Sequence, residues 1–171
     1  MTILVKNKHT LQIDEFQFRC CIGKNGLTKN KREGDKKTPV GLFKLGNLYY
    51  REDRISKPKT KLRCIKITKN MGWCDDQLDH KNYNRLINTK FVRKYEKLYR
   101  KDYKYDLLIP IKYNFKKPIP GKGSCIFLHL TKSYAPTAGC VAIAKNDFMT
   151  MLKISLKYSG IITIKLKFSF V

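Results

Sequence analysis

Both ends of the chain show the alternation of apolar and polar residues that is typical of half-buried β-strands. Near the N-terminus, three short runs rich in β-branched and aromatic residues, at 2–6, 11–13 and 16–22, are separated by polar turn positions. Near the C-terminus, every second residue from 162 to 170 is apolar, and Thr, Lys and Ser stand between them. These patterns predict strands at both ends, the last with one exposed face.

Two internal segments alternate in the same way. In residues 105–113, proline at position 110 requires an edge or a bulge, because proline cannot donate a ladder hydrogen bond. In residues 125–130, His129 lies near the end of the expected strand. The first segment places Leu107, Ile109, Ile111 and Tyr113 on one face; the second places Ile126, Leu128 and Leu130 on one face and Cys125, Phe127 and His129 on the other.

Two segments have helical spacing. Residues 88–100 predict a helix capped by Asn88 or Thr89, and residues 146–156 predict one capped by Asn146 or Asp147 and ended by Ser159-Gly160. The expected apolar stripes are Phe91, Tyr95, Leu98 and Tyr99 in the first helix and Phe148, Met151, Leu152, Ser155 and Leu156 in the second.

The remaining segments are short strands and loops. Residues 62–68 read as a strand, residues 38–45 (TPVGLFKL) as a turn into a strand, and the polar residues 24–37 as a mobile surface loop. No repeating βαβ pattern is present. We therefore expect a β-dominated α+β fold with few helices, and one domain over residues 1–171.

Composition narrows the possible partners. Among the 171 residues, Lys and Arg number 37 and Asp and Glu 13, a net charge of +24 that attracts anionic polymers or membranes. The basic residues are spread through every segment and no recognition helix or basic aromatic repeat occurs, which argues against nucleic-acid binding as the main function. No apolar run is long enough for a transmembrane helix, and MTILVKNKHT lacks the apolar region of a signal peptide.

Six cysteines are present, but their spacing indicates neither a disulfide framework nor a CxxC zinc site. Cys74, Asp76 and His80 in WCDDQLDH could ligate a metal, although a polar loop explains them equally well. We expect no metal and no cofactor.

One segment, residues 127–143 (FLHLTKSYAPTAGCVAI), contains a candidate cysteine nucleophile and a candidate histidine base. A cysteine nucleophile needs a base or cation beside it, since a free thiol has a pKa of about 8.5. A hairpin-like loop could bring Cys140 back to His129, and Gly139 would permit a tight turn with converging N–H groups. Spacing alone leaves two interpretations open, and the commoner arrangement is a buried structural thiol beside a core-edge histidine.

This segment resembles the active-site signature of the L,D-transpeptidase (YkuD-type) catalytic domain, in which a strand histidine is followed by a loop and a Ser/Thr-x-Gly-Cys block. The matching residues are His129, Thr137, Gly139 and Cys140. A second block, GDKKTPVGLFKL, is similar to the family's TPxGxF strand. The similarity continues through WCDD, YN and YDLLIPIKYN and covers about residues 18–144.

The resemblance implies a mixed β-sheet fold, sandwich-like or barrel-like, and a thiol mechanism. Cys140, with His129 as base, would attack the carbonyl before the terminal D-amino acid of a peptidoglycan tetrapeptide stem. The N–H groups of Cys140 and Gly139 would stabilise the oxyanion. An amine of a second stem would resolve the thioester in a transpeptidase, and water would do so in an L,D-carboxypeptidase. A non-enzymatic basic module that binds cell wall or nucleic acid is the alternative from another class.

The chain departs from the commonest family form, which has His before the Gly-Cys and Arg two places after the Cys. Here Ala138 and Ala142 occupy these positions, so other cations must bind the donor's carboxylate. Composition alone makes Arg51, Arg54 and Lys24 candidates. The expected substrate-binding residues are Thr137, Arg54, Trp73 and Tyr83.

The resemblance implies a location in the cell envelope, but the sequence shows no leader that would direct export. Such enzymes act in the cell envelope or periplasm, whereas abundant cysteines favour a reducing, cytoplasmic compartment. The expected partners are muropeptide donor and acceptor stems and an anionic cell-wall polymer, and we expect a monomer.

Overall fold

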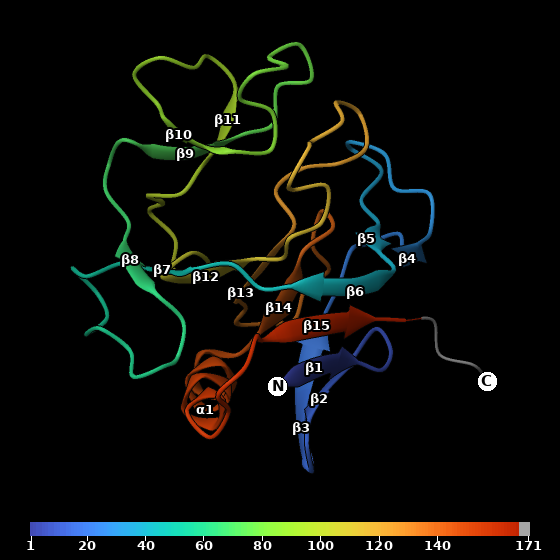
Figure 1. Cartoon of the computed structure of the whole chain (residues 1–171), viewed down its shortest axis with the longest axis vertical. Helices are drawn as coiled ribbons and strands as arrows, with labels where there is room; N and C mark the ends of the chain where they lie inside the picture. The colour runs from blue at the N-terminus through green and yellow to red at the C-terminus, as the bar shows by residue number, and fades with distance from the viewer. Residues whose placement is uncertain (168–171) are drawn as a thin grey trace.

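The computed structural model describes residues 1–167, which form a β-dominated fold with one helix in that part of the chain (Figure 1). The largest sheet has ten strands in the order β6-β15-β1-β2-β3-β14-β13-β12-β7-β8. In chain order these are β1 (Thr2–Val5), β2 (Thr10–Ile13), β3 (Phe16–Cys21), β6 (Gly41–Lys44), β7 (Leu48–Tyr50), β8 (Cys64–Lys66), β12 (Leu107–Pro110), β13 (Phe127–Leu130), β14 (Val141–Ile143) and β15 (Thr163–Leu166).

This large sheet is mixed and curled (Figure 1). Three pairs of neighbours are parallel: β1 with β15, β7 with β8, and β13 with β14. The other neighbours are antiparallel. The expected β-dominated α+β class with a mixed sheet is confirmed.

Two smaller sheets complete the strands. One has the order β10-β9-β11, and the other pairs β4 with β5. The three-stranded sheet and the helix α1 lie at opposite ends of the long axis of the molecule (Figure 1). The bounds are β9 (Met71–Cys74), β10 (Leu86–Asn88), β11 (Tyr95–Lys97), β4 (Leu27–Thr28), β5 (Thr38–Pro39) and α1 (Lys145–Ser155).

The central strands separate two apolar clusters, as their alternation predicted. Ile126, Leu128 and Leu130 join a cluster that also contains the buried side of α1. On the opposite face, Phe127 and Cys140 join a mainly aromatic cluster. The β12 residues divide in the same way, with Leu107 and Ile109 in the first cluster and Leu108 in the second. The candidate site therefore lies on the face of the sheet that α1 does not cover.

The predicted helix over residues 88–100 is wrong. Its first residue, Asn88, ends β10, and residues 95–97 form β11; both strands pair antiparallel with β9. Leu98 is buried but Phe91 is 84% exposed, so the expected apolar stripe does not form. Aromatic and β-branched residues have low helix propensity, and pairing with β9 gives their backbone an alternative.

The C-terminal helix forms, with different ends. The N-cap residue is Ala144, and no side chain caps it, so the expected capping by Asn146 or Asp147 is wrong. Phe148, Met151, Leu152 and Ser155 are buried as expected, whereas Leu156 follows the helix and is exposed.

The last predicted strand is confirmed over β15, where alternate residues are buried. The expected apolar positions 168 and 170 lie outside the described residues. Proline at position 110 is the last residue of β12 and lies beyond the register that β12 shares with β7, although its carbonyl still accepts from Gly46 N–H at 2.8 Å.

Candidate active site

The parallel pairing of β13 with β14 brings the histidine and the cysteine to one face. His129 pairs with Ala142, and residues two apart on a strand point the same way, so Cys140 points to the His129 side of the sheet. The connection between them is not the hairpin-like loop expected from the sequence, because the two strands run parallel. It crosses beside the end of β3, where Thr137 N–H donates to Ile22 O at 2.9 Å.

Cys140 lies between two cavities. The first, of about 280 Å³, is lined by both His129 and Cys140. The second, of about 220 Å³, is lined by Cys140 and Gly139. We call these the histidine cavity and the loop cavity. Although the whole Cys140 residue is only 8% exposed, its surroundings are two cavities and aromatic rings, not a sealed aliphatic core.

The resting Cys140 is a protonated thiol. Its Sγ donates to Cys125 O at 3.1 Å and accepts from Phe127 N–H at 3.4 Å. Burial raises its pKa to about 12, although the Phe127 N–H partly opposes this because it favours the thiolate. Cys140 therefore needs a base that removes its proton during attack.

His129 has the protonation state that such a base requires. Burial lowers its pKa to about 4, so the imidazole is neutral near pH 7. Its Nδ1 lies 3.0 Å from Leu130 O, and a carbonyl only accepts, so Nδ1 carries the hydrogen. Nε2 is then the basic nitrogen. The Tyr105 ring contacts the imidazole edge-on, with 5.3 Å between ring centroids.

The turn before Cys140 is held by two threonines. Thr137 Oγ1 donates to Cys140 O at 2.6 Å and accepts from Gly139 N–H at 3.1 Å. The buried Thr38 Oγ1 donates to Gly139 O at 2.8 Å, which joins the TPVG block to the cysteine block. Since Gly139 N–H is already engaged, its expected role as an oxyanion donor is unsupported in this state. Gly139 instead provides a backbone with φ of +143°.

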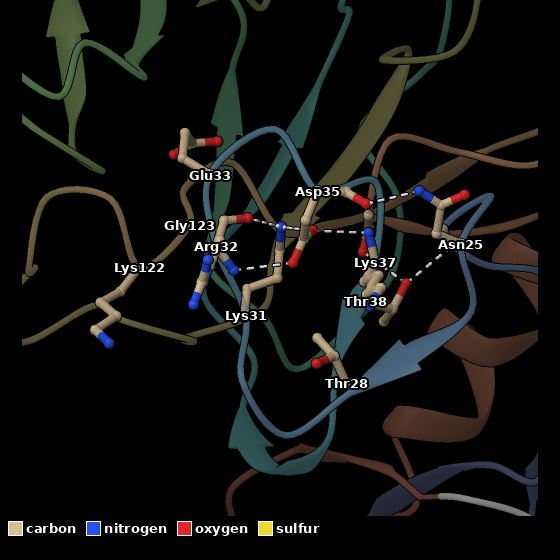
Figure 2. Close-up of polar contacts among 12 residues, drawn as sticks. Asn25, Thr28, Lys31, Arg32, Glu33, Asp35, Lys37, Thr38, Lys122 and Gly123 are labelled. Atoms are coloured by element: carbon tan, nitrogen blue, oxygen red, sulfur yellow. Dashed lines mark hydrogen bonds and ion pairs between the residues drawn. The ribbon is translucent and has the colours of Figure 1, made fainter.

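The polar segment 24–37 forms one wall of the loop cavity. Lys31 is only 4% exposed, so the expectation of a surface loop is wrong at this residue. Its Nζ donates to Asp35 at 2.5 Å and to Arg32 O at 2.7 Å, and Asp35 also accepts from Arg32 N–H and Lys37 N–H (Figure 2). These bonds fix the residues beside Gly139, because Thr38 follows directly.

Trp73 and Tyr83 lie in the core and line neither cavity. Trp73 Nε1–H donates to Asn84 Oδ1 at 2.9 Å, and Cys125 N–H donates to the same oxygen at 3.2 Å. Tyr83 O–H donates to Glu33 at 2.5 Å. The WCDD and YN blocks thus support the segment that leads into β13.

The expected carboxylate-binding cations lie elsewhere. Arg51 and Arg54 line a third cavity that does not include Cys140. Arg51 is 3% exposed and donates to Asp53 and to Arg100 O, while Arg54 donates to Asp106. Lys24 lines neither cavity around Cys140.

Sequence analysis missed two residues that line both cavities around Cys140. They are Glu96 from β11 and Tyr105, which precedes β12. Burial and the Cys140 thiol hold the pKa of Tyr105 well above its usual value. Pairing of β11 with β9 positions Glu96, and no local sequence signal reports that pairing.

No group of three His, Cys, Asp or Glu side chains within residues 1–167 is placed to hold a metal ion, so Cys74, Asp76 and His80 do not gather there. All six cysteines are free thiols.

A cysteine and a histidine that line one cavity suit acyl transfer through a thioester. The family model described as the L,D-transpeptidase catalytic domain (YkuD) matches residues 1–157, and the chain belongs to this family. Members are L,D-transpeptidases that use a cysteine on peptidoglycan stem peptides. No curated protein matches the chain. Over the stretch that the structure describes, no helix has the length and apolar character needed to span a membrane.

Proposed function

We propose that this chain is an L,D-transpeptidase whose nucleophile is Cys140 and whose general base is His129. The observation that carries the proposal is that both side chains line one cavity, with a neutral imidazole and a protonated thiol. Membership in the family supports the same chemistry. The donor is a tetrapeptide stem, and the bond broken precedes its terminal D-amino acid.

In the first half-reaction, Cys140 gives its proton to His129 Nε2 and attacks the carbonyl carbon. The thiol hydrogen bond to Cys125 O breaks, while the Phe127 N–H bond to Sγ favours the developing thiolate. The imidazolium then protonates the departing amine as the C–N bond breaks, which leaves a thioester on Cys140. Cys140 N–H is the proposed oxyanion donor.

In the second half-reaction, an amine of another stem attacks the thioester and loses a proton to His129. The C–S bond of the thioester breaks, and the Cys140 thiolate takes the proton back from the His129 imidazolium. The loop cavity supports transfer to an amine over hydrolysis, because it gives a second substrate its own approach to Cys140. The envelope is the proposed place of action, and an anionic wall polymer is a proposed partner of the +24 chain.

The test is turnover of purified tetrapeptide muropeptides, followed by mass spectrometry. We expect cross-linked dimers and released D-amino acid from the wild type, and neither from Cys140→Ala. The matched control is Cys64→Ala, since Cys64 is a half-buried thiol that lines neither cavity and should keep full activity. Release of the D-amino acid by Cys140→Ala would overturn the proposal, and tripeptide without dimers would identify the L,D-carboxypeptidase.

A further inference from the structure

We propose that Arg100 and Lys104 bind the terminal carboxylate of the donor stem, and that the enzyme therefore selects stems with a free C-terminus. This inference rests on the proposed function and adds the residues that determine donor specificity. The first step concerns distance. The carboxylate is one residue beyond the scissile carbonyl, and one residue spans about 3.8 Å. Its partner must therefore line a cavity that Cys140 also lines.

This requirement selects the cations of the histidine cavity. Arg100, Lys104 and Lys132 line it, and Glu96 is its one acidic residue within the described chain. The ion pairs formed within residues 1–167 leave both lysines without a carboxylate partner. Lys104 and Lys132 are both exposed, so their charges are available to a ligand that enters.

Arg100 is paired with Asp102 and Glu96, so it offers directed N–H donors, and the unpaired charge comes from Lys104. A guanidinium has five N–H donors. Three hydrogen bonds engage it: Nε and Nη2 bind Asp102 at 3.0 and 2.6 Å, and Nη1 binds Glu96 at 3.1 Å. Two N–H groups remain, which is the number that a bidentate carboxylate uses. The carboxylate partners also hold the side chain in place before a ligand arrives.

Both residues lie close to the catalytic pair. The Arg100 Cζ is 5.0 Å from the centroid of the Tyr105 ring, and that ring contacts the His129 imidazole. Lys104 O accepts from Leu130 N–H at 3.0 Å, which fixes Lys104 beside the end of β13. Lys132 follows β13 in the loop that leads toward Cys140, and no backbone hydrogen bond among the described residues fixes it beside β13. The proposal is therefore limited to Arg100 and Lys104.

The test compares two donor stems that differ only at the C-terminus, one with a free carboxylate and one amidated. A charge-assisted hydrogen bond predicts a kcat/KM about tenfold or more higher for the acid. Lys104→Met should remove much of this preference without harming the fold, because Lys104 is exposed. Arg100→Met should remove more, and Lys69→Met, an exposed lysine of the third cavity, should leave the preference unchanged.

Ala142→Arg added to Lys104→Met gives a rescue, since Ala142 lines the same cavity and would return a cation to it. We expect the preference for the acid to recover in part. Equal turnover of both donors by the wild type, or an unchanged preference in Lys104→Met and Arg100→Met, would overturn this inference and leave the proposed function intact. A wild type that turns over neither donor would refute the proposed function itself, and the inference with it.

Discussion

The two cavities that meet at Cys140 have opposite chemistry. The histidine cavity has Arg100, Lys104 and Lys132 against one acidic residue, Glu96, and Arg100 is paired with Glu96 and with Asp102. The loop cavity has three carboxylates in its wall, from Glu33, Asp75 and the paired Glu96, and two lysines, of which Lys31 is already paired with Asp35. One thiol is thus approached from a cationic side, which suits a carboxylate, and from an acidic side, which suits an amine.

The acidic side has a group that lacks a partner. Asp75 Oδ1 is buried without a hydrogen bond among the described residues, and burial raises the pKa of this carboxyl group. Glu33, in contrast, already accepts from Tyr83 and Ser124. Of these two carboxylates, Asp75 is therefore the one whose hydrogen bonding a bound amine would complete.

The largest effect is expected when the residues that serve both cavities are removed. Cys140→Ala or His129→Ala should lower cross-linking and hydrolysis together by about 10³-fold or more, because members of a catalytic unit do not act additively. Turnover of muropeptides measures both products. The control is His80→Ala, an exposed histidine outside both cavities, which should retain activity. Full activity in His129→Ala would show that another group is the base.

Gly139 lines the loop cavity and lies in a turn that a side chain would strain. A Cβ at this position would lie 2.9 Å from Lys37 O on a backbone with φ of +143°. Gly139→Ala should therefore lower the free energy of unfolding by about 2 kcal/mol, measured by urea denaturation. Gly160→Ala is the control, because no atom lies within 4 Å of its built Cβ. Equal stability of the two variants would contradict the strained turn.

A smaller effect is expected from a substitution that alters the loop cavity and leaves the histidine cavity unchanged. Asp75→Asn removes charge from the loop cavity and keeps its shape, so we expect the ratio of cross-linked to hydrolysed product to fall about tenfold. The rate of donor acylation should stay the same. Asp76→Asn, whose side chain caps the Leu78 N–H outside the cavity, is the matched change. A ratio unchanged in Asp75→Asn would remove the acidic wall from acceptor binding.

The smallest expected effect is the pH dependence of the free energy of unfolding, which is weak near neutral pH. Because the pKa of His129 is lowered in the folded chain, only the unfolded chain binds a proton at this imidazole between pH 6.5 and about 4. The free energy of unfolding should therefore fall as the pH drops through this range. The raised pKa of Cys140 means that only the unfolded chain loses its proton above pH 9, so stability should fall as pH rises from 9 toward 12. Urea denaturation of Cys140→Ala should show a shallower alkaline decline than the wild type. An identical decline would place the thiol in a less buried site.

Strands with strict alternation were predictable from the sequence, and contacts between distant segments were not. The alternation in residues 125–130 correctly separated the face of His129 from the face packed on α1. The helix predicted over residues 88–100 was wrong because pairing with β9 overrides a weak local helical pattern. The prediction of a surface loop over residues 24–37 was wrong at Lys31, because polar composition does not indicate that this side chain is buried and bonded to Asp35.

The candidate site divides in the same way. A short motif was enough to predict Cys140 and His129 as a pair, because only the end of β13 and one loop separate them in the chain. The cation opposite them was not predictable, since many basic residues are available and composition does not say which one lines a cavity. Arg100 and Lys104 lie there because the chain returns from β11 into β12 beside β13.

The most direct measurement of the central claim is the mass of the protein after reaction with a tetrapeptide donor or a carbapenem, followed by peptide mapping. We expect one covalent acyl group on Cys140, absent from Cys140→Ala, and formed much more slowly in His129→Ala. An acyl group on Cys125 or another cysteine, or none at all while the stem is still cleaved, would contradict it.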